Sequence, residues 1–288
     1  MCIDNALYLW YCIAVGQVDS TKGRKTMSSL RMKLKAGQKL CGTHVSLTDP
    51  SVCEILGYQG FDYLWIDMEH TYIDYKTLLI HLNAARAAGT SAVVRIPEND
   101  LVTLKKVLEM GPEGIIFPMV KTYEQAQTLI NASLYPPRGN RGFGPKRAIR
   151  YGIDDVEEYI RKGSKDTCRF IQIEHVDTLS CLDKILTIDE IDGYIIGPCD
   201  LSGSIGELPD VFGANTMRLI EQIVCRVKAA GKPVGVSYGA YDEQTVRVWH
   251  DLGMDFISLG GDAEYIQKGA KAALDALKAF HGDAPEVG

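Results

Sequence analysis

The chain has 288 residues, 46% hydrophobic and 24% charged, which is enough for one large core and an awkward length for two domains. Its formal net charge of -6, with acidic and basic residues interspersed, gives no electrostatic footprint for nucleic acid or for an anionic membrane surface. We therefore expect a single domain whose partner is a small molecule.

The N-terminal residues do not look like part of that domain. The apolar run at 6–15 is too short to span a bilayer and has no basic flank before it, so it is not a convincing signal. Residues 20–27 are polar, and Met27 is a natural start for the segment that follows. We expect residues 1–26 to be a dispensable, disordered extension or a start-site artefact, residues 27–283 to form the domain, and 284–288 to be a frayed tail.

From Met27 onward, short apolar runs rich in β-branched and aromatic residues alternate with longer amphipathic runs, the pattern of repeated βα units. Thr122 with Gln125 predicts a capping box at one helix start, and Asn215 predicts a helix cap at another. Eight runs are predicted to be strands: 40–45, 63–67, 92–96, 114–119, 169–174, 193–197, 233–237 and 255–259.

The connections between these elements are unequal, because helix-to-strand segments are short and strand-to-helix segments are long. Insertions that collect on one face predict a single-domain TIM (β/α)8 barrel with its active site at the carboxyl ends of the strands. An open doubly wound sheet is the alternative, but it would not explain polar residues after so many strands. These residues are His44, Asp67, Glu69, His70, Arg95, Glu174, Asp200 and Ser237.

Two carboxylates follow otherwise apolar runs. Glu174 ends the fifth predicted strand, and Asp200 follows the sixth. Oxygen ligands from neighbouring strand ends, without a nearby cluster of His and Cys, suit a hard divalent ion that keeps positions open for water and substrate. The pair therefore predicts a metal site in an enzyme that handles oxyacids.

The second and third strands end in groups with two interpretations each. In Asp67-Met-Glu-His70, a carboxylate beside an imidazole indicates a general base, and a structural knot of hydrogen bonds is the alternative. The shared face with Glu174 favours the base. Arg95 either pairs internally with Asp67 or Glu69, or meets a developing oxyanion on the substrate.

Other features narrow the chemistry. The loop at 135–144 is rich in glycine, so its backbone N–H groups can approach a carboxylate or phosphate; a rigid lid or interface loop is the alternative. It is not a dinucleotide fingerprint. Lys121 is the only lysine at a predicted strand end, and it more plausibly begins a helix, which disfavours a Schiff base. Cys199, which lacks a dedicated base, is expected to fill space near the ion. The eight cysteines show no C-x-x-C spacing, which fits a reducing cytoplasm.

Several motifs in order resemble the HpcH/HpaI aldolase family over nearly all of the chain from Met27 to Phe280. They are Gly60-Phe-Asp-Tyr-Leu-Trp-Ile-Asp-Met-Glu-His70, Val94-Arg-Ile-Pro97, Tyr135-Pro-Pro-Arg-Gly-Asn-Arg-Gly-Phe-Gly144, Gln172-Ile-Glu174 and Ile196-Gly-Pro-Cys-Asp-Leu-Ser202. The resemblance implies a TIM barrel, commonly hexameric, that acts as a class II pyruvate aldolase with a divalent metal.

The resemblance also implies roles for individual residues. Glu174 and Asp200 would hold Mg, Mn or Co, which would chelate the pyruvate carboxylate and keto oxygen. Arg95 would steady the enolate, and His70, oriented by Asp67, would take the proton from the C4 hydroxyl as the carbon–carbon bond breaks. The loop at 139–144, through Arg141 and Gly142, would help to hold the small oxyacid substrate, and the strand-end residue Ser237 would add a further substrate contact.

Three positions depart from the family pattern. His44 stands where an aromatic residue is expected on the substrate side, which leaves the aldehyde open. Cys199 replaces the usual alanine before Asp200. Glu109 stands where the family often offers an aspartate that reaches a neighbouring subunit's active site. We expect a homo-oligomer, in which the helix at 262–280 packs an alanine-rich face against a neighbour.

The expected reaction is therefore cleavage of a 4-hydroxy-2-oxo acid to pyruvate and an aldehyde. One alternative keeps the metal and the enolate but changes the reaction, as in a CoA-ester lyase of the citrate lyase type or another metal-enolate enzyme. A second alternative is a catalytically silent protein that binds oxyacids.

Overall fold

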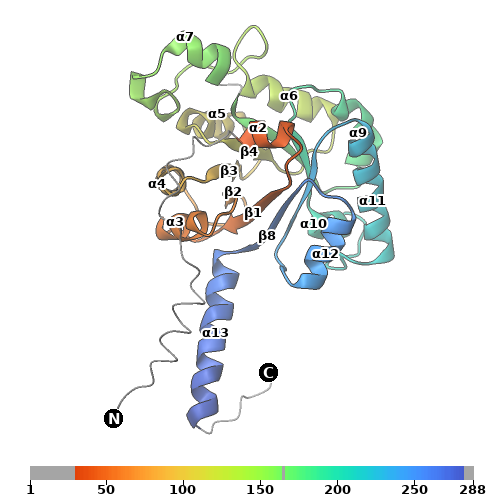
Figure 1. Cartoon of the computed structure of the whole chain (residues 1–288). Helices are drawn as coiled ribbons and strands as arrows, with labels where there is room; N and C mark the ends of the chain where they lie inside the picture. The colour runs from red at the N-terminus through yellow and green to blue at the C-terminus, as the bar shows by residue number, and fades with distance from the viewer. Residues whose placement is uncertain (1–29, 164–165, 282–288) are drawn as a thin grey trace.

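The computed structural model describes residues 30–163 and 166–281, so the predicted extension at 1–26 and the tail at 284–288 lie outside the described residues. Eight parallel strands pair in chain order and close into a barrel, which confirms the predicted (β/α)8 fold (Figure 1). The strands are β1 (Leu40–Val45), β2 (Tyr63–Asp67), β3 (Ser91–Arg95), β4 (Gly114–Phe117), β5 (Cys168–Ile173), β6 (Gly193–Ile196), β7 (Val234–Tyr238) and β8 (Phe256–Gly261).

Helices follow the strands and cover most of the barrel. None of the helices in the two described ranges is long and apolar enough to cross a lipid bilayer. They are α2 (Leu30–Lys35), α3 (Ser51–Tyr58), α4 (Tyr75–Ala88), α5 (Leu101–Met110), α6 (Tyr123–Ser133), η1 (Arg147–Gly152), α7 (Val156–Glu158), η2 (Tyr159–Gly163), α9 (Thr178–Leu186), α10 (Pro198–Gly203), α11 (Ala214–Ala229), α12 (Glu243–Asp251) and α13 (Asp262–His281).

The local signals decide where these helices begin. The capping box at Thr122 and Gln125 is confirmed, since each side chain accepts from the other's backbone N–H. The predicted cap at Asn215 is wrong: Gly213, in an extended conformation, is the N-cap of α11, and Asn215 lies in the first turn. Its side-chain amide donates to Glu207 instead.

The alternation of side chains along each strand decides which residues face the inside of the barrel. Apolar side chains from the first part of the strands fill the interior at the amino ends, and α2 closes that end with Leu30 and Leu34. Alternate positions further along the same strands are polar. The apolar cluster at the amino ends consists of Leu30, Leu34, Leu40, Tyr63, Trp65, Val93, Ile116, Cys168, Phe170, Ile195 and Phe256.

Helix α13 departs from the barrel plan. Its first residue is anchored, because Asp262 accepts hydrogen bonds from the backbone N–H groups of Ser46 and Leu47. Beyond that anchor the helix projects away from the strands (Figure 1). The outer face of β1 and β8 is therefore left as an apolar groove of about 650 Å³, lined by Cys41, Gly42, Ile55, Leu56, Gln59, Phe61, Tyr241, Val246, Ile257, Leu259 and Tyr265.

Candidate functional site

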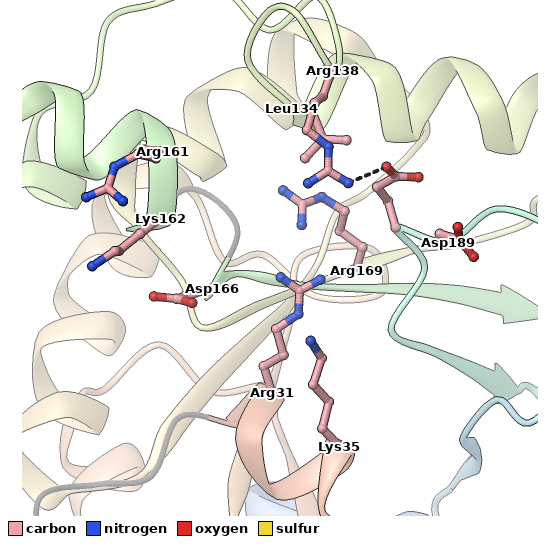
Figure 2. A pocket seen from close by; sticks show the side chains of 10 residues that line it. Arg31, Lys35, Leu134, Arg138, Arg161, Lys162, Asp166, Arg169 and Asp189 are labelled. Carbon is pink, nitrogen blue, oxygen red and sulfur yellow. Dashed lines mark hydrogen bonds and ion pairs between the residues drawn. The ribbon is translucent and has the colours of Figure 1, made fainter.

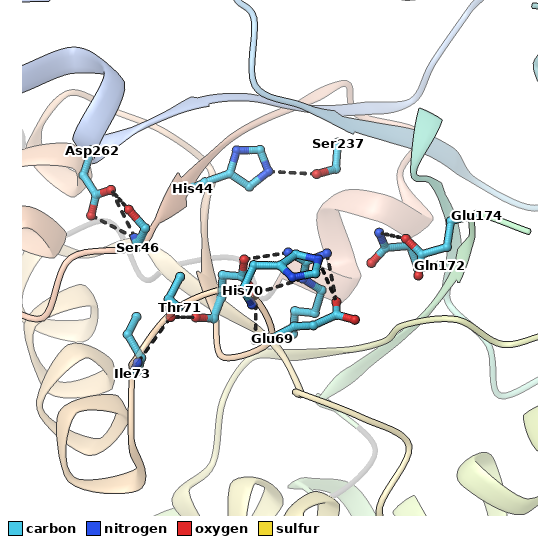
Figure 3. Close-up of polar contacts among 12 residues, drawn as sticks. His44, Ser46, Glu69, His70, Thr71, Ile73, Gln172, Glu174, Ser237 and Asp262 are labelled. Atoms are coloured by element: carbon cyan, nitrogen blue, oxygen red, sulfur yellow. Dashed lines mark hydrogen bonds and ion pairs between the residues drawn. The ribbon is translucent and has the colours of Figure 1, made fainter. Parts of the chain in front are cut away.

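The carboxyl ends of the strands bring most of the predicted polar residues to one opening (Figure 3). Asp67 and Arg95 are the last residues of β2 and β3, and they pair in register. Glu174 directly follows β5, and Asp200 lies in the first turn of α10 after β6. Residues two apart on a strand share a face, so alternation turns these side chains toward the same space.

Arg95 is held by two carboxylates. Its Nε donates to Asp67 Oδ1 at 2.9 Å and its Nη2 to Asp67 Oδ2 at 2.5 Å, while Nη1 lies 3.0 Å from Glu69 Oε2. The guanidinium also stacks over Trp65, 5.3 Å from the ring centroid. The internal pairing considered from the sequence is therefore present. Two of the five N–H groups of the guanidinium are hydrogen-bonded, both to Asp67, while the contact with Glu69 is an ion pair without a hydrogen bond.

The charges in this cluster shift one another's ionisation. Burial opposes ionisation of Asp67, but the hydrogen bonds and charge of Arg95 outweigh burial and hold the pKa of Asp67 below its usual range. Burial raises the pKa of Glu69 despite Arg95 nearby, and the charges of Asp67 and Asp200 add to the increase. Four carboxyl groups, those of Asp67, Glu69, Glu174 and Asp200, thus act on one another beside the single guanidinium of Arg95.

Glu174 is the most perturbed of the carboxylates. Only 2% of its surface is exposed, and burial, reinforced by the negative charges of Glu69 and Asp200, raises its pKa to about 7. Its Oε1 accepts from the backbone N–H of Met119 at 2.6 Å, and its Oε2 accepts from Gln172 Nε2 at 2.5 Å. A side chain at Gly197 would meet Glu174 Oε2 at 2.6 Å, so the close packing there requires glycine.

The residues around Glu174 fit a hard divalent cation. Glu174 and Asp200 supply oxygen ligands from adjacent elements, and the buried Oε1 of Gln172 has no hydrogen-bond partner among the described residues. A cation here would offset the burial, and the charges of Glu69 and Asp200, that raise the pKa of Glu174. Within the described ranges, no three His, Cys, Asp or Glu side chains form a closed metal site, so the pair would leave positions for water and substrate.

His70 lies at the rim of the opening, with 63% of its side chain exposed. The structure corrects how it is oriented. Asp67 accepts from the backbone N–H of His70 at 3.4 Å, but its carboxylate is committed to Arg95. The imidazole Nε2 instead lies 3.8 Å from Glu69 Oε2. The carboxylate beside the imidazole is therefore Glu69.

His44 and Ser237 meet across the barrel mouth from β1 and β7. His44 Nε2 lies 2.8 Å from Ser237 Oγ, and Nδ1 lies 2.6 Å from the carbonyl oxygen of Gly260. His44 packs edge-on against Trp65, with ring centroids 5.3 Å apart. His44 and Ser237, each predicted to contact substrate, thus form one pair. The pair lies beside Trp65, the ring on which Arg95 is stacked.

Cys199 is exposed at the start of α10, next to Asp200. Burial of part of its thiol, followed by the charge of Asp200, raises its pKa. A protonated thiol is a poor nucleophile, and the expectation that Cys199 fills space near the ion remains a prediction.

Glu109, Arg141 and Gly142 do not join this opening within one chain. Glu109 lies near the end of α5, the helix that leads from the carboxyl end of β3 back to the amino end of β4. Gly144 packs on the carboxylate of Glu109, so the glycine-rich loop runs along the same helix. Arg141 is buried over the Tyr135 ring at 4.5 Å. The predicted contacts of these residues with substrate remain predictions.

A cavity of about 610 Å³ lies at the opposite end of the barrel, where Arg31 and Lys35 of α2 face Arg138 and Arg169 (Figure 2). Its cations have internal partners: Arg138 pairs with Glu190 at 2.6 Å and Arg31 with Asp192 at 2.7 Å. This is the end of a (β/α)8 barrel that serves stability, so we do not assign the active site there.

Sequence reasoning gave no role to Gln172, Met119 or the carbonyl of Gly260. Gln172 had a detectable signal, because it lies two residues before Glu174 and therefore on the same strand face. Met119 and Gly260 act through their backbones. Both adopt positive φ angles, 49° and 62°, a feature that depends on the folded path of the chain.

Comparison with known proteins finds relatives that are named as aldolases. A hydroxypyruvate/pyruvate aldolase of Roseovarius nubinhibens is 32% identical over 247 residues, which cover 86% of this chain and 95% of that protein. A 4-hydroxy-2-oxovalerate aldolase of Novosphingobium aromaticivorans is 35% identical over 249 residues, covering 86% and 94%. The crystal structure of a Burkholderia cenocepacia protein of the HpcH/HpaI aldolase/citrate lyase family superimposes with a TM-score of 0.81 at 26% identity, covering 87% and 99%.

The sequence model of the HpcH/HpaI aldolase/citrate lyase family matches residues 40–268. This range includes every strand of the barrel and both candidate metal ligands. The chain belongs to the HpcH/HpaI aldolase/citrate lyase family.

Proposed function

We propose that this protein is a metal-dependent class II aldolase that cleaves a 4-hydroxy-2-oxo acid to pyruvate and an aldehyde. The observation that carries the proposal is the buried carboxylate of Glu174, whose pKa is raised to about 7, at the same carboxyl ends of the strands as Asp200 and Arg95. Relatives named as aldolases of 2-oxo acids support the reaction class.

Glu174 and Asp200 would hold the divalent cation, Mg, Mn or Co. When bound, such a cation supplies Lewis-acid polarisation of the substrate's keto group, which makes an enolate accessible near neutral pH without a lysine imine. N–H groups of Arg95 that are not hydrogen-bonded to Asp67 would donate to the oxygen on which negative charge develops.

His70 would serve as the general base for cleavage. Its exposed imidazole takes the proton of the C4 hydroxyl, the electrons of the C3–C4 bond pass into the pyruvate enolate, and the aldehyde leaves. Glu69, 3.8 Å from Nε2, favours the imidazolium that forms. Protonation of the enolate at C3 then gives pyruvate, and condensation runs through the same steps in reverse.

The test is exchange of the pyruvate methyl protons in heavy water, followed by NMR with Mg²⁺, with chelator, and with Glu174→Ala. We expect the methyl signal to disappear when the cation is present. It should persist with chelator and in the Glu174→Ala variant. This assay needs no aldehyde. Absence of exchange with folded, cation-binding protein would overturn the proposal and favour a CoA-ester lyase or a silent oxyacid-binding protein, which calorimetry with CoA esters and with oxyacids would separate.

We also propose that the protein is a homo-oligomer in which α13 of a second copy fills the groove on β1 and β8. The groove is where the helix after β8 would cover a barrel, as shown by the exposure of Cys41 on the outer face of β1. Helix α13 exposes Ile266, Leu274, Leu277 and Phe280 at 57%, 50%, 60% and 93%. A reciprocal exchange would cover both surfaces in a closed two-fold dimer. The hexamer implied by the family resemblance remains a prediction.

A further inference from the structure

The starting point is a directed chain of hydrogen bonds at the barrel mouth, formed by Gly260, His44 and Ser237. A backbone carbonyl only accepts, so the Nδ1 of His44, 2.6 Å from Gly260 O, must carry a hydrogen. Gly260 has a φ of 62°, and a side chain there would collide with Tyr265 at 2.6 Å, so glycine is required where this carbonyl turns toward His44.

The direction of the second bond follows from the first. Burial, aided by the charge of Arg95, lowers the pKa of His44, so the imidazole is neutral at physiological pH. A neutral imidazole that is protonated on Nδ1 has only a lone pair on Nε2. The hydroxyl of Ser237, 2.8 Å away, therefore donates to His44, and its only hydrogen is committed to that bond. Toward the barrel mouth, Ser237 Oγ presents lone pairs alone.

The location of the pair connects it to the reaction. His44 contacts Trp65, and Trp65 carries the guanidinium of Arg95 on its face. Figure 3 shows His44 and Ser237 together at the top of the view, Gln172 and Glu174 together at its right, and His70 and Glu69 below His44 and Ser237. Both members of the pair are partly exposed, so a substrate can reach them. If pyruvate occupies the Glu174 side, the pair lies on the side of the aldehyde.

We infer that Ser237, oriented by His44, accepts a hydrogen bond from a hydroxyl group of the aldehyde half, so that the natural acceptors are hydroxyaldehydes. An acceptor-only oxygen attracts a hydroxyl and repels a carboxylate at the same place. This inference rests on the proposed aldolase function and adds the substrate class. It excludes a semialdehyde whose carboxylate contacts this pair.

The test uses three acceptors of nearly equal size with pyruvate as donor: glycolaldehyde, acetaldehyde and glyoxylate. They present a hydroxyl, a methyl and a carboxylate group, respectively. The measured quantity is kcat/KM for each acceptor in the wild type, Ser237→Ala, His44→Phe and the conservative control Ser237→Thr. Ratios between acceptors cancel general losses of activity, and comparison of each ratio across proteins cancels intrinsic differences in aldehyde reactivity.

We expect the glycolaldehyde-to-acetaldehyde ratio to fall about ten-fold in Ser237→Ala, the range of a single hydrogen bond whose loss leaves a polar partner unpaired. His44→Phe, which keeps a ring against Trp65, should lower this ratio similarly and improve glyoxylate relative to glycolaldehyde, because the freed Ser237 hydroxyl can then donate. Ser237→Thr should retain the wild-type ratios.

Two outcomes would overturn the inference while the proposed function stands. One is acceptor ratios that are unchanged in active Ser237→Ala and His44→Phe. In the other, the wild type prefers hydroxypyruvate to pyruvate as donor, the two variants lose that preference, and the acceptor ratios do not change. This result would place the pair on the donor side. Absence of pyruvate proton exchange and of product with every acceptor in the wild type would instead refute the aldolase function itself.

Discussion

Asp67 accepts two parallel hydrogen bonds from Arg95, 2.9 Å and 2.5 Å long, at the point where β2 and β3 pair in register. The same guanidinium is stacked on Trp65, one inward position earlier on β2. A planar fork held by a planar carboxylate has a fixed direction, so this pair sets where the remaining N–H groups of Arg95 point.

The first prediction concerns this pair. Asp67→Asn keeps the shape but leaves the buried guanidinium without its full counter-charge, and breaking such a pair typically costs about 3–5 kcal/mol. We expect lower stability in urea unfolding and a fall in kcat of at least about 100-fold, the range for loss of preorganised charge stabilisation. Arg95→Lys should not restore Arg95→Ala, because an ammonium cannot make both contacts. A fully active Asp67→Asn protein would refute the positioning role.

The second prediction concerns the stability of the cation-free protein as pH changes. The pKa of Glu174 is about 7 in the folded state against 4.5 for an ordinary glutamate, so the native state binds more protons between these values. Its contribution to stability is therefore present below pH 4.5 and is lost as the pH rises through 7. Glu174→Gln cannot ionise and should be more stable than wild type at pH 8 by on the order of 3 kcal/mol.

The measurement is urea unfolding with chelator at pH 5 and pH 8. Glu124→Gln, an exposed change in the first turn of α6, is the matched control and should show no such gain. An equal effect of both substitutions at pH 8 would mean that Glu174 ionises normally.

The third prediction concerns cation binding to Glu174 and Asp200. A cation binds the ionised carboxylate, so Mg²⁺ or Mn²⁺ should raise the melting temperature more at pH 8 than at pH 6. At a concentration one hundred times Kd, the gain corresponds to about 2.7 kcal/mol. Glu174→Ala and Asp200→Ala should each remove it. Equal stabilisation of both variants would place the cation elsewhere.

The fourth prediction separates two half-reactions by means of His70. His70→Ala should reduce aldol cleavage by about 100-fold or more, in the range of general base catalysis, but should reduce pyruvate proton exchange much less. The reason is that the C4 hydroxyl is present only in the cleavage substrate. His250→Ala, an exposed histidine on α12, is the control and should match wild type. Unimpaired cleavage by His70→Ala would show that another group is the base.

The fifth prediction concerns α13. Leu274→Asp with Leu277→Asp puts two charges on its exposed apolar face, and we expect light scattering to show a smaller assembly. Ala272→Asp carries a charge on the opposite face, at about 100° per residue, and should keep the wild-type mass. A monomeric wild type, or an unchanged mass in the double variant, would exclude the exchange of α13.

Sequence periodicity alone determined the barrel and much of its mouth. Short apolar runs that alternate with longer amphipathic runs predicted all eight strands, within one or two residues at their ends, because parallel strands of a barrel are buried on both faces. The same pattern placed Asp67, Arg95 and Glu174 at carboxyl ends, where parallel strands must gather them. These relations are local in the chain, so the sequence contains them.

Only the tertiary structure decided how those groups behave. The carboxylate beside His70 is Glu69, since Arg95 from the next strand claims Asp67. The pKa of Glu174 depends on burial by several elements, and the direction of the Ser237 hydroxyl depends, through His44, on the backbone of Gly260 in the neighbouring strand β8. The packing of the loop at 139–144 along α5 was likewise visible only in the structure. Ionisation, hydrogen-bond direction and loop position follow from what surrounds a group in space, and residues distant in the chain supply those surroundings.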